Sequence, residues 1–309
     1  MARKLGLVLG SGAARGWAHV GVLRGLEEIG VKPDIIAGCS VGALVGGAYL
    51  IGALEEFEAW GRELSPLSAM GAFNFWVNRG GLVDAAPAFE AFAAFDRNIE
   101  DLPIKFGAVA ADLGTGEEVW ITQGSVIEAA RASSAIPVLF HAVQRGPRWL
   151  VDGAVANPAP VSLARYLGAD IVLSVDLNAI PRVLSRFNPP PPGVPALDPL
   201  AAFSSPDSFS GAVTKFIEDT RSRIERQMAI AKSRAQSKPQ LFETAYAAVD
   251  IFQMHLTRLR AETSPPDIHL TPDMRDALPN SFDRADEFIE NGRAALLHKR
   301  DEIFALLKD

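Results

Sequence analysis

The chain has 309 residues, of which 48% are hydrophobic and 22% are charged, and this composition supports either one large domain with elaborations or one domain with a small appendage. The formal net charge of −7 argues against a nucleic-acid-binding protein, because such proteins usually carry a basic patch. A single cysteine, Cys39, excludes an intrachain disulfide framework and a cysteine-rich zinc site.

The N-terminal sequence, MARKLGLVLGSG, does not have the pattern of a signal peptide. Two basic residues precede its apolar run, but glycines interrupt that run too early. No stretch contains the roughly 18 to 20 uninterrupted apolar residues of a membrane-spanning helix. We therefore expect a cytoplasmic protein, and contact with the surface of a membrane remains open.

Four short segments are continuously apolar, which is typical of parallel strands that are buried on both faces. These segments are residues 4–10, 34–38, 104–112 and 169–177. Helical patterns lie between them, at residues 19–29, 41–51 and 126–132. The alternation predicts an α/β fold in which helices cover both faces of a mainly parallel sheet.

The first predicted strand runs into a glycine-rich turn and a helix, in the sequence LVLGSGAARGWAHVGVL. A dinucleotide-binding loop would require the spacing G-x-G-x-x-G, which Gly10, Gly12 and Gly16 do not provide. The alternative is a loop whose backbone N–H groups bind an anion beside a reactive group. Arg15 either attracts a phosphate or pairs with an acidic residue to brace the turn, and both interpretations remain open.

The second predicted strand and helix flank GCSVG, a G-x-S-x-G pattern centred on Ser40. This context is the one expected of a nucleophile elbow. Gly38 and Gly42 would let neighbouring backbones approach the turn closely. The N-terminus of the following helix would favour negative charge that develops at the serine. A chance match in a glycine-rich chain is the alternative, and the flanking elements favour the elbow.

A serine nucleophile needs a group that accepts its proton. No histidine lies on a clear loop at the end of a strand, so we expect all five to be structural or exposed: His19, His141, His255, His269 and His298. Asp152, in RWLVDGAVANPAP, follows a short apolar strand and precedes Gly153. It is the better candidate, although on the local residues alone a turn-capping aspartate is the favoured interpretation.

The chain changes character beyond the fourth predicted strand. Residues 188–199, NPPPPGVPALDP, indicate a loop or linker, and residues 208–237 indicate a solvated basic helix rather than a site for anionic lipids. Residues 242–259 predict an amphipathic helix that docks on a core or on a partner. Its apolar stripe comprises Phe242, Ala245, Val249, Phe252, Leu256 and Leu259. Residues 265–272 predict a strand, and residues 282–307 a terminal helix.

Together these segments resemble the patatin-like phospholipase family, in its bacterial branch related to the catalytic domain of neuropathy target esterase. Residues 7–49 resemble the family's oxyanion loop, first helix and nucleophile elbow. RASSAIPVLFHAV, residues 131–143, is similar to its A-S-x-A-x-P segment, and residues 150–177 resemble its D-G-[AG] segment. Residues 265–273 and 281–296 are similar to the family's C-terminal end.

The resemblance implies a three-layer α/β/α sandwich with a mainly parallel central sheet and a C-terminal helical elaboration. We expect residues 1–180 to form the catalytic core and residues 181–207 to form a proline-rich linker. Residues 208–309 would form a mainly helical part that packs on the core. The sequence carries no signal for an oligomeric state.

The resemblance also implies catalysis by a Ser-Asp dyad, with Ser40 as the nucleophile and Asp152 as the general base. Partial burial would raise the pKa of Asp152 and make it a better base. The reaction would be hydrolysis of acyl esters in phospholipids, lysophospholipids or related lipids, without a cofactor or a metal ion. An acyltransferase or a thioesterase with the same dyad, and a non-catalytic lipid-binding or regulatory protein, are the alternatives.

The family's oxyanion loop corresponds to the segment from Gly10 to Ala13, that is Gly10, Ser11, Gly12 and Ala13. The family commonly has G-G-G-G-A-R-G, so Ser11 and Ala13 depart from it, and either residue would be strained where φ is positive. The motif residues around the dyad are Gly38, Gly42, Gly153 and Ala154, with Asn157 and Pro160 in supporting places.

Residues 64–84 concentrate apolar side chains between prolines and glycines. They include Met70, Phe73, Phe75, Trp76 and Val77. A core helix is one interpretation. A mobile lip over an acyl-chain pocket, or a surface that dips into lipid, is the other.

Overall fold

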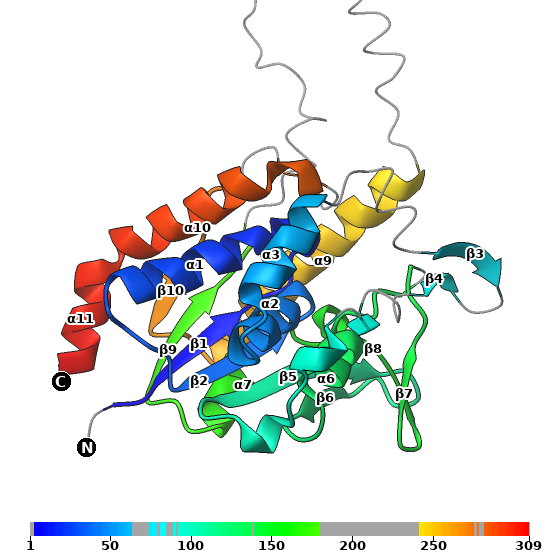
Figure 1. Cartoon of the computed structure of the whole chain (residues 1–309), viewed down its shortest axis with the longest axis horizontal. Coiled ribbons are helices and arrows are strands. Elements are labelled where there is room, and N and C mark those ends of the chain that lie inside the picture. The colour runs from blue at the N-terminus through cyan, green and yellow to red at the C-terminus, as the bar shows by residue number, and fades with distance from the viewer. Residues whose placement is uncertain are drawn as a thin grey trace, which may run out of the picture. The chain divides into compact units, whose positions relative to one another are not determined.

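The computed structural model (Figure 1) describes residues 3–63, 74–78, 81–84, 89–90, 92–137, 139–179, 241–274, 277 and 281–308. Residues 1–182 and 249–309 form one compact unit, and residues 183–248 form a second unit. The elements below belong to the first unit, except for the first eight residues of the helix that begins at Leu241. The predicted linker and basic helix lie outside the described residues, and the predicted domain ranges stay a prediction.

Five parallel strands form the centre of the main sheet. In sheet order they are β10 (Ile268–Leu270), β9 (Ile171–Val175), β1 (Leu5–Leu9), β2 (Ile35–Cys39) and β5 (Lys105–Asp112). These strands confirm the four predicted buried strands and the predicted strand near the C-terminus. The antiparallel strands β6 (Glu118–Ile121) and β8 (Arg148–Asp152) both pair with β5, and β7 (Val143–Arg145) pairs with β8. The sheet is therefore mixed but mainly parallel.

A second sheet contains only β3 (Asn74–Asn78) and β4 (Gly81–Asp84), which pair antiparallel. The core-helix interpretation of this region is therefore wrong for these residues, because their backbone is extended and paired. Residues 64–73 lie outside the described residues. The interpretation as a lip stays a prediction.

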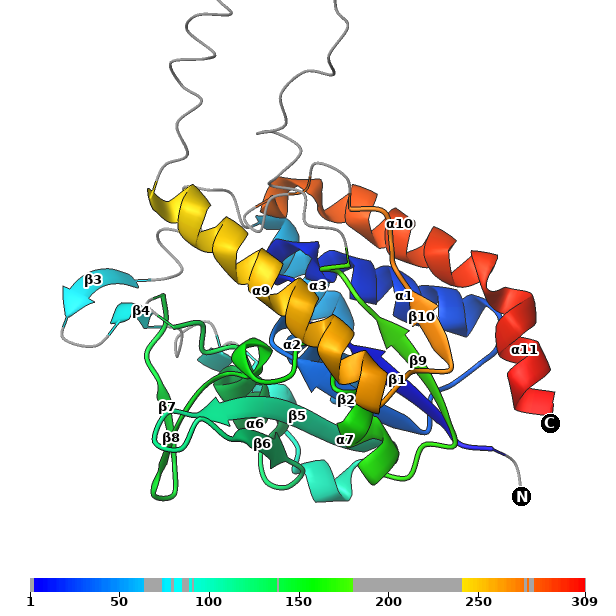
Figure 2. The same ribbon diagram turned by 180° about the vertical axis from the view of Figure 1, so that it is seen from behind.

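Helices cover both faces of the main sheet (Figures 1 and 2). One face carries α1 (Trp17–Glu28), α2 (Val41–Leu50), α3 (Leu54–Glu63), α6 (Val126–Ser133), α10 (Ala285–His298) and α11 (Arg300–Lys308). The opposite face carries α7 (Val161–Tyr166), and Figure 2 shows the part of α9 (Leu241–Thr263) that belongs to this unit crossing that face. The fold is thus the expected three-layer α/β/α sandwich, and Lys299 divides the predicted terminal helix into two.

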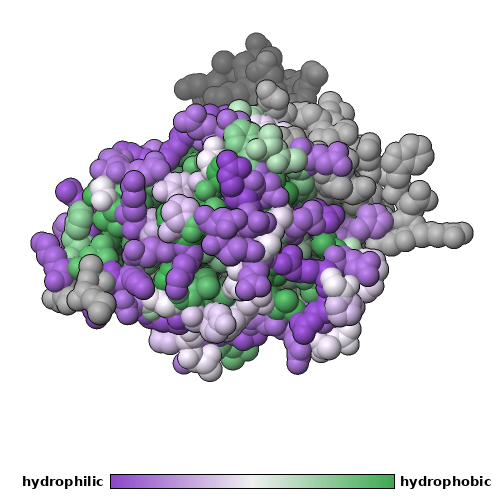
Figure 3. Space-filling model, turned by 60° about the horizontal axis from the view of Figure 1, so that its bottom comes forward, coloured by the Kyte–Doolittle hydropathy of each residue, from purple (hydrophilic) through white to green (hydrophobic). Residues whose placement is uncertain are grey.

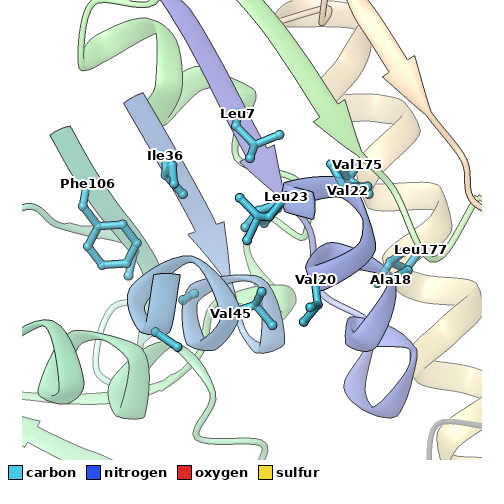
Figure 4. Packing of buried hydrophobic residues seen from close by; sticks show 14 of the residues in the cluster. Leu7, Ala18, Val20, Val22, Leu23, Ile36, Val45, Phe106, Val175 and Leu177 are labelled. Carbon is cyan, nitrogen blue, oxygen red and sulfur yellow. The ribbon is translucent and has the colours of Figure 1, made fainter. Parts of the chain in front are cut away.

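Successive side chains of the central strands point to opposite faces of the sheet, and both faces are buried. Figure 4 shows Leu7, Ile36 and Phe106 on three neighbouring strands, pointing toward Leu23 of α1 and Val45 of α2. The residues next to them in sequence belong to the core beneath α7; these include Val8 and Ile35. Because both faces are covered, neither can be polar, which produces the pattern seen in the sequence.

Helices α1 and α10 pack at very close range along one side of the sandwich. A Cβ atom added to Gly292 would lie 2.0 Å from the carbonyl oxygen of Ala18, and one added to Gly21 would lie 1.8 Å from the carbonyl oxygen of Ile289. The two helix backbones are therefore in direct contact. This contact fixes α10 to α1, the first α-helix of the fold.

We expect Gly292→Ala to lower the free energy of unfolding by about 1 to 3 kcal/mol. Alanine normally stabilises a helix by roughly 1 kcal/mol over glycine, so the sign is decided by the clash with a backbone oxygen that cannot move aside. Urea denaturation measures the change. Gly47→Ala in α2 is the matched control. Its Cβ would meet a side chain, that of Val126, at 3.0 Å, whereas the Cβ at position 292 would meet a backbone oxygen. Equal stability of the Gly292 variant and the unaltered protein would contradict the close packing.

Helix α9 buries a different face from the predicted one. Val249, Phe252 and Leu259 of the apolar stripe are 46%, 55% and 60% exposed. Asp250 and Met254 are buried instead. The prediction that the stripe docks on the core is therefore wrong for these residues, because ionic and hydrogen-bonding contacts orient the helix. Docking of the stripe on a partner stays a prediction.

The coloured residues on the face shown in Figure 3 are mainly hydrophilic, with smaller hydrophobic areas between the polar side chains. Within the part of the chain that the structure describes, no helix is long and apolar enough to span a bilayer.

Candidate active site

The pairing of strands brings the ends of β2 and β8 together. Strand β2 pairs with β5 as far as Cys39 opposite Val109, and β8 pairs with β5 from Leu150 to Asp152, which lies opposite Ala110. Strand β6 occupies the other edge of β5 along both stretches. Therefore β2 and β8 lie on the same edge of β5 and run toward each other. The residues at their C-terminal ends must meet there.

Ser40 occupies the sharp turn between β2 and α2. Its backbone has φ 56° and ψ −124°, which is an unusual left-handed φ for a residue with a side chain. Its carbonyl oxygen accepts hydrogen bonds from the N–H groups of Ala43 and Leu44, which begin the helix. Strained backbone of this kind persists only where the surrounding fold holds it in place, and it is typical of residues in active sites.

Ser40 and Asp152 are in direct contact. The Ser40 hydroxyl donates a hydrogen bond of 2.6 Å to Oδ2 of Asp152. The other carboxylate oxygen, Oδ1, accepts a hydrogen bond of 2.8 Å from the N–H of Ala154, and the Asp152 N–H donates to the carbonyl oxygen of Ala135 at 2.9 Å. Both side chains are buried. The structure thus brings together the two residues that the sequence separates by 112 positions.

Burial changes the acidity of this carboxyl group. It raises the pKa of Asp152 from its ordinary value of 3.8 to about 6, while hydrogen bonds from the Ser40 hydroxyl and the Ala154 N–H lower the pKa in part. These bonds stabilise the ionised form, and desolvation disfavours it. At neutral pH the carboxylate is mainly ionised, and it accepts a proton more readily than an ordinary aspartate does.

Ser133 is a site residue for which the sequence offered no role. Its hydroxyl accepts a hydrogen bond from the Ser40 N–H at 2.9 Å and donates one to the Val109 carbonyl oxygen at 2.6 Å. It therefore ties the strained Ser40 backbone to β5. The only signal in the sequence is its place in the family-like segment of residues 131–143.

Gly42 allows the elbow to pack directly on the loop after β1. A Cβ atom at this position would lie 2.0 Å from the Leu9 carbonyl oxygen and 2.8 Å from that of Gly10. No side chain fits there, as the sequence predicted. The contact places the loop from Gly10 to Ala13 beside the turn that carries Ser40.

Two N–H groups of this loop are already used. The Gly10 N–H donates to the Val175 carbonyl oxygen at 3.1 Å, and the Ser11 N–H donates to that of Pro158 at 2.9 Å. The N–H groups of Gly12 and Ala13 donate no hydrogen bond to any residue that the structure describes. Those two groups are the donors that remain for an anion beside Ser40.

Of the two residues that depart from the family's loop sequence, Ser11 and Ala13, one has a positive φ. Ala13 has φ 51°, so it adopts the left-handed conformation that costs a residue with a Cβ about 1 to 2 kcal/mol. Ser11 is not among the described residues with positive φ. The strain therefore falls on Ala13 alone, and other contacts must hold the loop in this shape.

Arg15 supports the bracing interpretation of its role. Its side chain is 2% exposed and forms an ion pair of 2.8 Å with Asp250. Its Nη2 also donates to Asn178 Oδ1 at 2.7 Å, and its Nε donates to the Gly12 carbonyl oxygen at 3.1 Å. An arginine that is engaged in this way is not directed at a phosphate.

Two histidines have partners other than Ser40 and Asp152. His19 is buried, and its Nε2–H donates to the Gly10 carbonyl oxygen at 2.7 Å. Burial lowers the pKa of His19 to about 4, so this histidine is neutral. His269 pairs with Asp176 at 3.4 Å and is half exposed. Both observations agree with the expectation of structural or exposed histidines.

The side-chain NH2 group of Asn157 forms hydrogen bonds with residues other than Asp152. Its Nδ2 donates to Glu118 at 2.9 Å and to Ser162 at 3.1 Å, so it braces the segment that follows the acid. Pro160 lies at the start of α7. A supporting role of these two residues in the site stays a prediction.

The thiol of Cys39, next to Ser40 in sequence, is a poor candidate for a nucleophile. Cys39 is fully buried, and burial, together with the charge of Asp152, raises the pKa of its thiol well above the ordinary value. A protonated thiol is a poor nucleophile. Among the described residues, no cluster of three or more histidine, cysteine, aspartate or glutamate side chains could hold a metal ion. The arrangement can therefore provide a hydroxyl nucleophile, a carboxylate base and two N–H donors.

The chain is similar in sequence to one protein family and to several known proteins. A model of the family described as patatin-like phospholipase matches residues 7–165, just over half of the chain. An uncharacterised NTE family protein of Mycobacterium bovis is 37% identical over 177 residues, which cover 57% of this chain and 49% of that protein. A protein of Emericella nidulans that is named a lysophospholipase is 30% identical over 187 residues, which cover 58% of this chain and 12% of that protein.

The chain spans about half the length, or less, of the curated relatives it matches. Among solved structures, VipD from Legionella pneumophila aligns with 97% of this chain and 67% of that one, with a TM-score of 0.42 and 12% identity.

Proposed function

Because this chain belongs to the patatin-like phospholipase family, we propose that it is a serine esterase that hydrolyses acyl esters of phospholipids or lysophospholipids. The observation that carries the proposal is the buried 2.6 Å hydrogen bond from the Ser40 hydroxyl to Asp152. A hydroxyl that donates to a carboxylate with a raised pKa has a proton acceptor in place.

The proposed reaction has two stages. In the first, the Ser40 oxygen bonds to the acyl carbonyl carbon while its proton moves to Asp152. The ester C–O bond then breaks, and the alcohol leaves with the proton from Asp152. In the second stage, Asp152 takes a proton from water, the resulting hydroxide attacks the acyl-serine ester, and the fatty acid leaves while Ser40 regains its proton.

We propose that the N–H groups of Gly12 and Ala13 bind the negative oxygen that develops in both stages. The sequence predicted an oxyanion hole formed by four residues, Gly10 to Ala13. The proposal keeps two of them as donors, because the N–H groups of Gly10 and Ser11 donate to other carbonyl oxygens. The adjacent N-terminus of α2 adds the positive end of a helix dipole. Preorganised donors of this kind favour the transition state over the substrate.

Lipid as the acyl donor is proposed from the family and from the relative that is named a lysophospholipase. Acyl transfer to an alcohol, thioester hydrolysis and a non-catalytic role are the competing functions. Peripheral contact with a membrane and a cytoplasmic location also remain proposals.

Product analysis by mass spectrometry separates these functions. The protein is supplied in turn with a phosphatidylcholine, a lysophosphatidylcholine, and an acyl-CoA with and without an alcohol acceptor. We expect free fatty acid and the deacylated lipid from the first two. Predominant formation of a new ester would favour the acyltransferase, and turnover of acyl-CoA alone would favour the thioesterase. If no substrate is turned over, the hydrolase proposal is wrong.

A further inference from the structure

Helix α9 turns polar side chains toward the loop that follows β1. Asp250 is buried, and Gln253, three residues later, reaches the same loop. An amphipathic helix normally buries its apolar stripe. The opposite orientation here requires partners for the buried polar groups, since an unpaired buried charge is costly.

Those partners lie on the proposed oxyanion loop and on the chain just after β9. Asp250 pairs with Arg15 at 2.8 Å, and both side chains are buried. Gln253 Oε1 accepts hydrogen bonds from the Ser11 hydroxyl at 2.8 Å and from Asn178 Nδ2 at 3.0 Å. Arg15 Nη2 donates to Asn178 Oδ1 at 2.7 Å, so the two sets of contacts form one network.

The network holds two carbonyl groups whose orientation matters. Asn178 Nδ2 donates to the Ser11 carbonyl oxygen at 3.0 Å. The backbone N–H and Nε of Arg15 donate to the Gly12 carbonyl oxygen at 3.2 and 3.1 Å. In a trans peptide, the C=O of one residue and the N–H of the next lie in one plane and point in opposite directions. Holding these carbonyls therefore fixes the N–H groups of Gly12 and Ala13.

We propose that Asn178, Asp250 and Gln253 are positioning residues that orient the two N–H donors of the oxyanion loop. This inference rests on the proposed function, in which Gly12 and Ala13 bind the oxyanion. All three residues lie beyond the segment of residues 7–165 that matches the family. Helix α9 is thus part of the catalytic apparatus through the loop it holds, although it contacts no reacting atom.

The network also accounts for the two departures from the family's loop sequence. Ser11 supplies a hydroxyl that a glycine would lack, and this hydroxyl bonds to Gln253 on α9. Ala13 adopts a left-handed φ, which the flanking contacts must maintain. The loop sequence and the polar face of α9 therefore complement each other in this chain.

The test uses the full chain with Asp250→Asn, Gln253→Leu and Asn178→Ala. A soluble short-chain ester gives kcat and KM, and a boronic acid that mimics the tetrahedral intermediate gives a Ki. We expect kcat to fall by about 10- to 100-fold while KM changes less than about threefold, because the donors act mainly in the transition state. The Ki for the boronic acid should rise in proportion to the loss of kcat, which a general loss of structure would not produce.

Glu28→Gln is the matched control for Asp250→Asn. It removes the carboxylate that binds Arg293 between α1 and α10, away from the loop. Thermal melts identify any variant that fails to fold. Ser11→Ala then tests the same network through two neutral hydrogen bonds, one that the Ser11 hydroxyl donates to Gln253 and one that it accepts from Asn178. Folded variants with kcat and boronic acid Ki unchanged would overturn the positioning role. If those variants stay active and Ser40→Ala is inactive, only the positioning inference fails; if Ser40→Ala is also active, the proposed function fails.

Discussion

Ser40→Ala is expected to reduce kcat for ester hydrolysis by at least about 10⁴-fold, because it removes the hydroxyl that would form the acyl intermediate. The Ser40 hydroxyl has one donor bond, to Asp152, so its removal should leave the fold intact. It should also raise the pKa of Asp152 further, since that hydroxyl is one of the two hydrogen bonds that lower it. Steady-state kinetics on a lysophospholipid measure the loss.

Ser134→Ala is the matched control for this change. Ser134 is also buried and directly follows Ser133 in sequence, but its hydroxyl donates to the Ala130 carbonyl oxygen of the preceding helix, α6, at 2.8 Å. We expect this variant to keep near-normal kcat. Activity of the Ser40 variant within tenfold of the unaltered protein would exclude Ser40 as the nucleophile.

Asp152→Asn is expected to lower kcat by about 10³-fold or more, because an amide does not accept the serine proton. An asparagine has nearly the same shape. Its oxygen can still accept from the Ala154 N–H, and its NH2 can donate to Ser40. The loss would therefore report the missing base rather than a rearranged site. Steady-state kinetics on the same lysophospholipid measure it, and a folded variant with full activity would contradict the dyad.

The raised pKa of Asp152 also predicts two pH effects. Below pH 6 the protonated carboxyl cannot act as a base, so kcat/KM of the unaltered protein should rise with pH, with a midpoint near 6, and level off above it. The stability of the folded protein depends on pH in the opposite direction. The folded pKa of about 6 exceeds the ordinary 3.8, so the contribution of Asp152 to stability is greatest below pH 3.8 and is lost as pH rises through 6.

The size of that lost stability follows from the shift. About two pKa units correspond to on the order of 3 kcal/mol. Asp152→Asn removes this cost, so its stability relative to the unaltered protein should increase between pH 4 and pH 8. Urea denaturation of both proteins at the two pH values measures the difference. A difference that is independent of pH would contradict the buried, raised-pKa carboxyl.

The local elements around the site could be predicted because each is encoded in adjacent residues. A continuous apolar run, a glycine-rich turn and a helical pattern identified β1 with α1 and β2 with α2. The position of Ser40 at a strand-to-helix turn followed from GCSVG together with the apolar strand before it and the helical pattern after it. Asp152 did not follow in this way. It was the better candidate for the proton acceptor, but a D-G pair is common in turns, and only the family resemblance favoured a catalytic role over a turn cap.

Long-range pairing could not be predicted from the same patterns. The meeting of Ser40 and Asp152 depends on β8 running antiparallel along the edge of β5 beyond the end of β2, and no local signal specifies that. The apolar stripe on α9 predicted the wrong buried face, because a local pattern cannot reveal that Asp250 pairs with Arg15, 235 residues away. Ser133 was missed for the same reason.

The central claim is that Ser40 is a nucleophile activated by Asp152. Reaction with a fluorophosphonate probe, followed by peptide mapping, tests it most directly, because the probe bonds only to an activated serine. We predict one adduct, on Ser40, that is absent in Ser40→Ala and strongly reduced in Asp152→Asn. Labelling of another serine, or rapid labelling of Ser40 in a folded Asp152→Asn variant, would contradict the claim.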